Sequence, residues 1–248
     1  MNNVYTGTSG FSYRHWMGTF YPEDIPASRQ LEFYAENFNT VEINSSFYHL
    51  PKKATYEGWQ KRTPDDFRFV IKGSRHITQF LQLKNTGEAV TRFFEPAEAL
   101  SKKLEIVLWQ LPPGLSGEPE RLNSFLEEVH KNKVGKKTRH AFEFRNKTWF
   151  SDEVYAVLRA KNSGFVIADS NRYPSAEAVT ADFIYLRFHG VPDLFASNYS
   201  DESLQEWAGK AKKWARGGDV FAYFNNDARG FAIPNAIKLR EFLTEKAK

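Results

Sequence analysis

The chain contains no cysteine among its 248 residues. That absence excludes disulfides, thiolate nucleophiles, cysteine-bound zinc and iron–sulfur clusters, although it does not fix the redox compartment. The sequence also lacks an apolar run near the roughly 18 residues of a membrane span. Its N-terminus lacks the basic and apolar regions of a signal peptide. We therefore expect a cytoplasmic protein with no membrane partner.

Linkers and repeats are missing as well. No Gly/Ser/Pro-rich stretch divides the chain, and no internal repeat or low-complexity segment is visible. With 41% hydrophobic residues, a chain of this length buries enough surface to fold without disulfides or a structural metal. We expect one domain spanning residues 1–248.

What recurs instead is a short β-branched or aromatic run followed by a helical segment. The candidate strands are Val4–Gly7, Thr40–Asn44, Phe67–Lys72, Glu105–Leu111, Ala141–Arg145, Phe165–Asp169, Phe183–His189 and Val220–Asn225. Eight such strands in this length predict the α/β class and a closed (β/α)8 TIM-like barrel of parallel strands. A doubly wound open sheet is the alternative, but it usually has fewer strands and a Gly-rich first turn.

Helical spacing of apolar residues is clear between most of these strands. Leu122, Phe125 and Val129 follow it, and Ser151 and Ser200 are plausible N-cap residues for two later helices. The connections after the second and sixth strands carry the weakest helical pattern.

Polar residues end nearly every candidate strand. Alternate strand residues point into a barrel, and the last inward residue of each strand faces the site at its C-terminal end. Any one of these side chains alone is more often solvated or part of a structural ion pair, but together they predict one shared cavity. The set is Glu42, Asn44, Lys72, Gln110, Glu143, Arg145, Asp169, Arg187, His189, Asn225 and Asn226.

Aromatic loops flank the same pole. Tyr13 and Trp16 follow the first strand and Tyr48 follows the second, so they could give a ligand ring a stacking surface or simply pack over the barrel end. The long loop at 190–200 could act as a lid.

Several long motifs occur in a recognisable order. They are GTSGFSYRHWMGTFYP (7–22), TVEINSSFYHLP (40–51), LWQLPPGL (108–115), AFEFRNKTWF (141–150), YLRFHG (185–190) and YFNNDARGFAIPNA (223–236). On these motifs the chain resembles the YecE-like family, also called domain of unknown function 72, over essentially its whole length. The resemblance implies a (β/α) barrel and no assigned activity.

The resemblance also marks individual positions. The family's motif residues here are Glu42, Asn44, Tyr48, Lys72, Gln110, Glu143, Arg145, His189, Asn225 and Asn226. One departure is visible, because the family often has Ile-Thr-His where this chain has Ile77-Thr78-Gln79. If that histidine is a ligand or base in relatives, Gln79 cannot replace it.

The leading hypothesis is a cofactor-free hydrolase or lyase acting on a small anionic, phosphorylated or sugar-like substrate. Lys72, Arg145 and Arg187 would bind phosphate or carboxylate. Glu143 would serve as general base or nucleophile, with His189 or Asp169 as its acid partner. The other substrate-binding candidates are Glu42, Asn44, Tyr13, Trp16, Tyr48, Gln110, Asn225 and Asn226.

Two alternatives stay open. A divalent-metal phosphoesterase or nuclease would use Glu143, Asp169 and His189 as ligands, although no HxH or HExxH spacing is present. A non-catalytic nucleic-acid or nucleotide binder would stack bases on Tyr13, Trp16 and Tyr48, and the net charge of +4 permits such a partner without requiring it. The sequence does not determine the oligomeric state.

Overall fold

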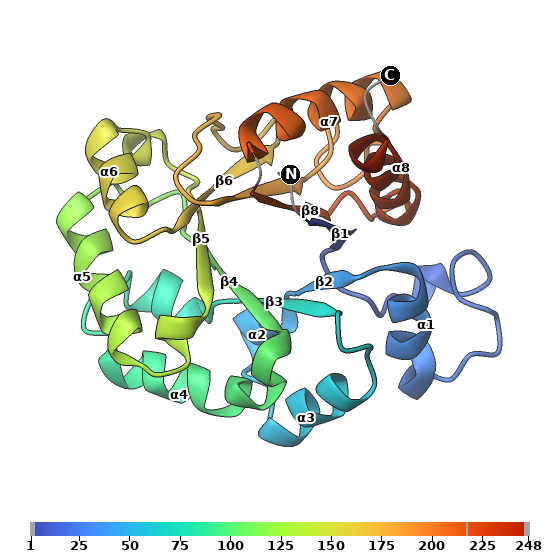
Figure 1. The fold of residues 1–248 in the computed structure, drawn as a ribbon, viewed down its shortest axis with the longest axis horizontal. Helices are drawn as coiled ribbons and strands as arrows, with labels where there is room; N and C mark the ends of the chain where they lie inside the picture. Colours follow the sequence, from blue (N-terminus) through green and yellow to red (C-terminus); the bar gives the residue numbers. More distant parts are fainter. Residues whose placement is uncertain (1–2, 217, 246–248) are drawn as a thin grey trace.

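The computed structural model describes residues 3–216 and 218–245, which form a ring of parallel strands enclosed by helices (Figure 1). The predicted span of 1–248 thus includes Gly217 and two short ends that lie outside the described residues. The strands are β1 (Val4–Thr8), β2 (Thr40–Ile43), β3 (Arg68–Lys72), β4 (Leu104–Gln110), β5 (Arg139–Glu143), β6 (Gly164–Asp169), β7 (Phe183–Phe188) and β8 (Asp219–Phe224). The predicted (β/α) barrel is confirmed, with strand limits that differ by one or two residues at most ends.

Helices fill most of the connections. They are α1 (Gln30–Asn37), α2 (Ser45–Tyr48), α3 (Lys53–Lys61), α4 (Gly87–Ala97), α5 (Pro119–Lys131), α6 (Asp152–Ala160), α7 (Asp201–Ala215) and α8 (Ala232–Thr244). Ser151 and Ser200 cap α6 and α7 by accepting backbone N–H groups, as predicted. The connection after β2 forms two helices despite its weak pattern, whereas residues 170–182 after β6 form none.

The barrel consists of two four-stranded halves. One half runs from β2 to β5 and the other from β6 through β7 and β8 to β1, with every pairing parallel. Only two residue pairs join β5 to β6, and a single bridge between Ser9 and Glu42 joins β1 to β2. Side chains must therefore supply much of the cohesion at these two seams.

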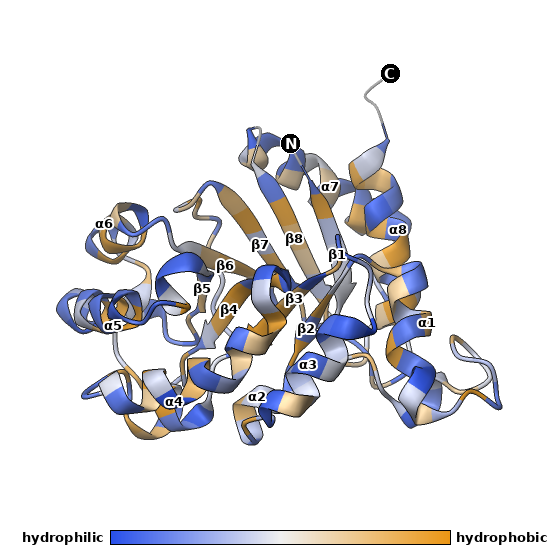
Figure 2. Cartoon of the chain, turned by 60° about the horizontal axis from the view of Figure 1, so that its bottom comes forward, coloured by the Kyte–Doolittle hydropathy of each residue, from blue (hydrophilic) through white to orange (hydrophobic). Residues whose placement is uncertain are grey.

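Alternation along the strands separates two packing layers. Inward residues form a small apolar cluster of Val70, Ile106, Leu108, Ala141, Val166, Phe183, Tyr185, Phe221 and Tyr223. Outward strand residues pack against the apolar faces of the helices, whose solvent faces are hydrophilic (Figure 2). The interior is thus a filled core, as in other barrels of this size, and not a channel.

Charged residues close the N-terminal end of the barrel below this cluster. Arg139 lies 2.8 Å from Asp219 and 3.3 Å from Glu105, and Arg68 lies 3.2 Å from the other oxygen of Glu105. This ring joins β3, β4, β5 and β8, so it ties the two halves together at the end opposite the proposed site.

Within the described residues, no helix is both long enough and apolar enough to cross a lipid bilayer.

Gly73, directly after β3, sits against the ring of buried Trp109. A Cβ atom at position 73 would lie 2.2 Å from Trp109 Cε3, whereas a Cβ at Gly209 in α7 would meet nothing within 4 Å. We expect Gly73→Ala to lower the free energy of unfolding by about 1–3 kcal/mol through overpacking. Gly209→Ala should raise it by up to about 1 kcal/mol through helix propensity. Urea unfolding of both variants measures the difference, and equal effects would contradict the tight packing at Gly73.

Candidate functional site at the barrel mouth

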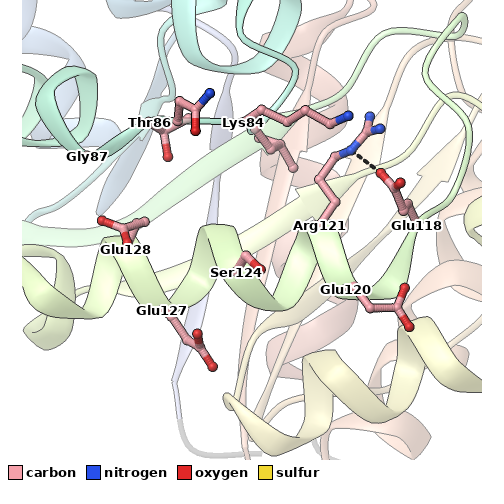
Figure 3. A pocket seen from close by; sticks show the side chains of 11 residues that line it. Lys84, Thr86, Gly87, Glu118, Glu120, Arg121, Ser124, Glu127 and Glu128 are labelled. Atoms are coloured by element: carbon pink, nitrogen blue, oxygen red, sulfur yellow. Dashed lines mark ion pairs between the residues drawn. The ribbon is translucent and has the colours of Figure 1, made fainter.

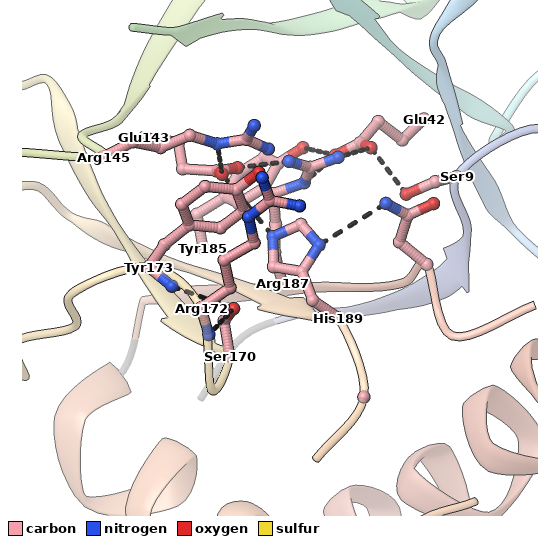
Figure 4. A network of polar contacts seen from close by, with 12 residues as sticks. Ser9, Glu42, Glu143, Arg145, Ser170, Arg172, Tyr173, Tyr185, Arg187 and His189 are labelled. Carbon is pink, nitrogen blue, oxygen red and sulfur yellow. Dashed lines mark hydrogen bonds and ion pairs between the residues drawn. The ribbon is translucent and has the colours of Figure 1, made fainter. Parts of the chain in front are cut away.

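Arg187 on β7 lies at the centre of a polar cluster at the C-terminal end of the strands (Figure 4). Its side chain is 1% exposed. Nε and Nη2 donate to the two oxygens of Glu42 at 3.0 and 2.7 Å, and Nη1 donates to Glu143 Oε2. Because β7 belongs to one half of the barrel and both glutamates to the other, this guanidinium links the two halves.

Glu42 is saturated with hydrogen bonds. Besides Arg187, the hydroxyls of Ser9 and Tyr185 each donate to it at 2.7 Å. Burial alone would raise the pKa of Glu42, but the charge and hydrogen bonds of Arg187 outweigh burial and lower it. Glu42 is therefore an ionised anchor with no spare acceptor position for a substrate.

Glu143 is also buried and fully ionised. Burial opposes the charge, but Arg187, then His189 and Arg145, hold the pKa of Glu143 well below its ordinary value. Arg145 Nε donates to Oε1 at 3.0 Å, and His189 Nε2 lies 3.5 Å from the same oxygen. A carboxylate held this way is a weak base and nucleophile, so its geometry suits orienting Arg145 and His189 instead.

His189, one residue beyond β7, is completely buried. Asn225 Nδ2 lies 3.4 Å from Nδ1, and an amide donating there leaves the proton on Nε2, which faces Glu143. Nε2 has no hydrogen-bond partner among the described residues. Burial lowers the pKa of His189 although Glu143 opposes the shift, so the ring is neutral near pH 7.

Lys72 ends β3 and is 8% exposed. Its ammonium makes no ion pair or hydrogen bond with any described residue, and it lies 4.4 Å from the centre of the Phe47 ring. Burial first, and then the charge of Arg187, lower the pKa of Lys72 to about 7, although Glu143 and Glu42 act in the opposite direction. Lys72 is thus an unpaired amine within the mouth, close to its midpoint of titration at neutral pH.

Arg145 keeps part of its guanidinium available. Nε is bound to Glu143, but no described residue accepts a hydrogen bond from either Nη group. Its planar face stacks on the Tyr173 ring at 4.0 Å, which fixes the orientation of the side chain. Arg145 and Lys72 therefore retain donors for a ligand, whereas each nitrogen of Arg187 already donates to a carboxylate.

Amide side chains complete this end of the barrel. Gln110 ends β4 with its side chain largely buried, and Asn44 Oδ1 is buried without a partner among the described residues. Gln79, at the position where the family often has histidine, donates to the Gln110 carbonyl oxygen at 3.0 Å. Its amide thus contacts the rim of the site through the main chain.

Asp169 lies apart from the cluster. It shares a strand face with Ile167, which packs in the outer core, and its carboxyl faces Tyr199, before α7, and Trp207 on α7. Burial raises the pKa of Asp169 in this position. The expected set of Glu143, Asp169 and His189 is therefore not assembled, because odd and even residues of β6 face opposite layers.

Asn226 and two of the three aromatic candidates have packing roles. Asn226 is buried and donates to Ser197 O at 2.9 Å and Asn235 Oδ1 at 2.8 Å, which holds the 190–200 loop to α8. Trp16 is buried with Nε1 bound to the Asp227 carboxylate. The hydroxyl of Tyr13 donates to Ser9 O. Tyr48, by contrast, is 57% exposed.

Two residues of the site, Tyr173 and Tyr185, were not predicted to belong to it. The period of two could have identified Tyr185, because it lies two positions before Arg187 on β7. Tyr173 belongs to the helix-free connection after β6, where no sequence pattern pointed to the site. Across the described residues, no group of three His, Asp or Glu side chains is arranged to hold a metal ion.

A separate groove of about 770 Å³ lies outside the barrel, between residues 83–87 and α5 (Figure 3). Glu118, Glu120, Glu127 and Glu128 make it mainly acidic, and Arg121 pairs with Glu118. None of the predicted site residues lines it.

Comparisons with known proteins find relatives that match this chain over most of their own length. The family model described as "Protein of unknown function DUF72" matches residues 5–248. UPF0759 protein YunF of Bacillus subtilis is 25% identical over 97% of this chain and 94% of that protein. UPF0759 protein YecE of Escherichia coli K12 is 27% identical over 85% of this chain and 82% of that protein.

Solved structures agree with this relationship. A DUF72 family protein from Thermotoga maritima superposes with a TM-score of 0.86 at 28% identity, covering 98% of this chain and all of that chain. A DUF72 protein from Enterococcus faecalis, at 23% identity and a TM-score of 0.81 over 99% of this chain and 97% of that one, shares the fold. The chain therefore belongs to the DUF72 family, as its sequence motifs indicated, and it has the TIM-like barrel of that family.

Proposed function

We propose that this protein is an enzyme, a hydrolase or lyase, that binds a small anionic substrate at the C-terminal mouth of its barrel. The observation that carries the proposal is the pair of cations, Lys72 and Arg145, whose donors are left unused beside a cluster of otherwise saturated charges. A carboxylate or a phosphate, including the phosphate of a sugar, has the charge and acceptor geometry to engage both.

Charge balance supports the same substrate class. Arg187 and Arg145 neutralise Glu42 and Glu143, so a protonated Lys72 leaves one positive charge in excess at a largely buried position. An unpaired buried charge is costly, and the lowered pKa of Lys72 reflects that cost. A bound anion would supply the missing counter-charge and favour the ammonium form.

His189 fits proton transfer better than Glu143 does. Glu143 stays ionised and lies beside His189, so it would stabilise the imidazolium that forms when His189 accepts a proton. Glu143 then acts as a positioning residue, His189 is a neutral ring that can accept a proton, and Lys72 has a pKa of about 7.

The other hypotheses receive less support. A metal site on Glu143, Asp169 and His189 would need Asp169 to turn from the outer layer, where it faces Tyr199 and Trp207, toward the inside of the barrel. A nucleic-acid binder would need exposed stacking rings, but Trp16 is buried and Tyr13 is packed against it, which leaves Tyr48. The arrangement of the side chains and the free donors of Lys72 and Arg145 therefore favour a small anionic substrate.

Sulfate is a suitable probe of the anion site because it does not titrate near neutral pH. We expect wild-type protein to bind sulfate, and Lys72→Met and Arg145→Met each to weaken the affinity roughly tenfold or more, the effect of losing one charge-assisted hydrogen bond. The affinity should fall as the pH rises through about 7, because Lys72 then loses its proton, and Lys72→Met should lack this dependence. Isothermal titration calorimetry measures both effects.

Lys136→Met is the matched control for the sulfate experiment. Lys136 is exposed and lies in the short segment Gly135–Lys137 after α5, so its loss removes the same charge from a different surface. The control should bind sulfate as wild type does. Equal affinities in all four proteins would contradict an anion site formed by Lys72 and Arg145.

The buried amine of Lys72 should also lower the free energy of unfolding of the wild-type protein. Its pKa is about 7 in the folded protein and about 10.4 in an unfolded chain, so the unfolded state binds more protons between these values. Wild-type stability is therefore lowered at and below pH 7 and recovers as the pH rises toward 10. We expect Lys72→Met to be more stable than wild type near pH 6 and to lose that advantage by about pH 10. Guanidinium unfolding across this pH range tests it, and a less stable variant near pH 6 would contradict the assignment.

A further inference from the structure

Two lysines are buried within the part of the chain that the structure describes, and their surroundings differ greatly. Lys103 is 2% exposed, and its ammonium donates to the carbonyl oxygens of Gln60 at 2.6 Å and Thr63 at 2.7 Å. Lys72 is almost as buried but has no such acceptors among the described residues. Lys103 is held as a structural cation, whereas no described residue accepts a hydrogen bond from the Lys72 nitrogen.

The reason lies in how the neighbouring charges are paired. Glu42 and Glu143 are the carboxylates that would attract the Lys72 ammonium. They already accept hydrogen bonds from Arg187 and Arg145. Burial lowers the pKa of Lys72 to about 7, and repulsion by the positive charges of Arg187 and Arg145 acts in the same direction. A lysine that is partly neutral at physiological pH is a strong nucleophile toward carbonyl carbon.

The main chain around Lys72 is fixed while its nitrogen is free. Ser46 Oγ donates to Lys72 O at 2.7 Å, and Gly73 N donates to Leu108 O at 2.8 Å. The amine therefore projects from a rigid strand end into the mouth, which is the placement that a preorganised nucleophile requires.

We propose that Lys72 forms an imine with a small molecule that carries both an aldehyde or ketone carbonyl and a carboxylate or phosphate, while Arg145 binds the anionic group. The proposal rests on the proposed anion site and narrows its chemistry to a lyase. The nitrogen lone pair attacks the carbonyl carbon and a C–N bond forms. The carbonyl oxygen takes one proton from the amine nitrogen and one from solvent and leaves as water, which gives a protonated imine.

The resulting iminium draws electrons from the neighbouring carbon. A C–C bond at that carbon breaks, its electron pair forms the C=C bond of an enamine, and the other fragment departs as a carbonyl compound when its hydroxyl gives a proton to a base such as His189. Reprotonation at carbon and addition of water then release the product carbonyl and restore the Lys72 amine. No oxidant or reductant is needed.

Reductive trapping tests this step on the wild-type protein. The protein is incubated with sodium cyanoborohydride and one of three carbonyl probes: glyoxylate, dihydroxyacetone phosphate, or neutral glycolaldehyde. Mass spectrometry of the digested protein then quantifies the adduct at every lysine. We expect one anionic probe to label Lys72 at least tenfold faster than exposed Lys136, and the preferred probe distinguishes a carboxylate from a phosphate substrate. Sulfate should compete, and the pH midpoint of labelling should lie near 7.

Lys103 is the matched control, because its saturated ammonium should stay unlabelled although it is equally buried. Labelling of Lys72 no faster than Lys136 with all probes would overturn the imine, and the proposed anion site would stand if sulfate still binds through Lys72 and Arg145. Fast labelling of Lys72 by glycolaldehyde and the anions alike, without sulfate competition, would instead overturn the anion site and with it this substrate class.

Discussion

The ion pairs of Arg187 are the constraint on which the rest of this structure depends. They connect β7 to Glu42 on β2 and Glu143 on β5, across a barrel whose two halves share few backbone hydrogen bonds at their seams. Removing one partner of such a buried pair typically costs about 3–5 kcal/mol, because the remaining charge is left unpaired. The mouth therefore keeps one arrangement, and every other polar group there adapts to it.

That arrangement divides the charged residues into two kinds. Glu42, Glu143 and Arg187 satisfy one another and stay ionised, so their role is to hold geometry and set the local field. Lys72 is buried beside them without an ion-pair partner among the described residues, and burial lowers its pKa to about 7, where proton transfer is useful. Burial also lowers the pKa of His189, which keeps its ring neutral. A similar ring of charges at the N-terminal pole pairs Arg68, Glu105, Arg139 and Asp219 with one another, although burial raises the pKa of Glu105.

Much of the site followed from a single rule, the alternation of strand residues. It placed Lys72, Gln110, Glu143 and Arg187 on inward faces at the same pole, because parallel strands in a barrel all end at one side. The same rule, applied strictly to β6, assigns Asp169 to the outer layer, where it faces Tyr199 and Trp207. The exposed position of Tyr48 and the packed position of Trp16 follow from loop conformation, for which the sequence has no comparable periodicity.

The sequence by itself determined the barrel, its direction and the family, because strand periodicity and long ordered motifs are local properties of the chain. It could not decide which charges pair, since Glu42, Glu143 and Arg187 are far apart along the chain and meet only when the strands close into a ring. These ion pairs determine which side-chain nitrogens already donate a hydrogen bond and which are left to bind a ligand. Only the tertiary structure therefore distinguished Arg187, a structural cation, from Lys72, the amine left without a partner.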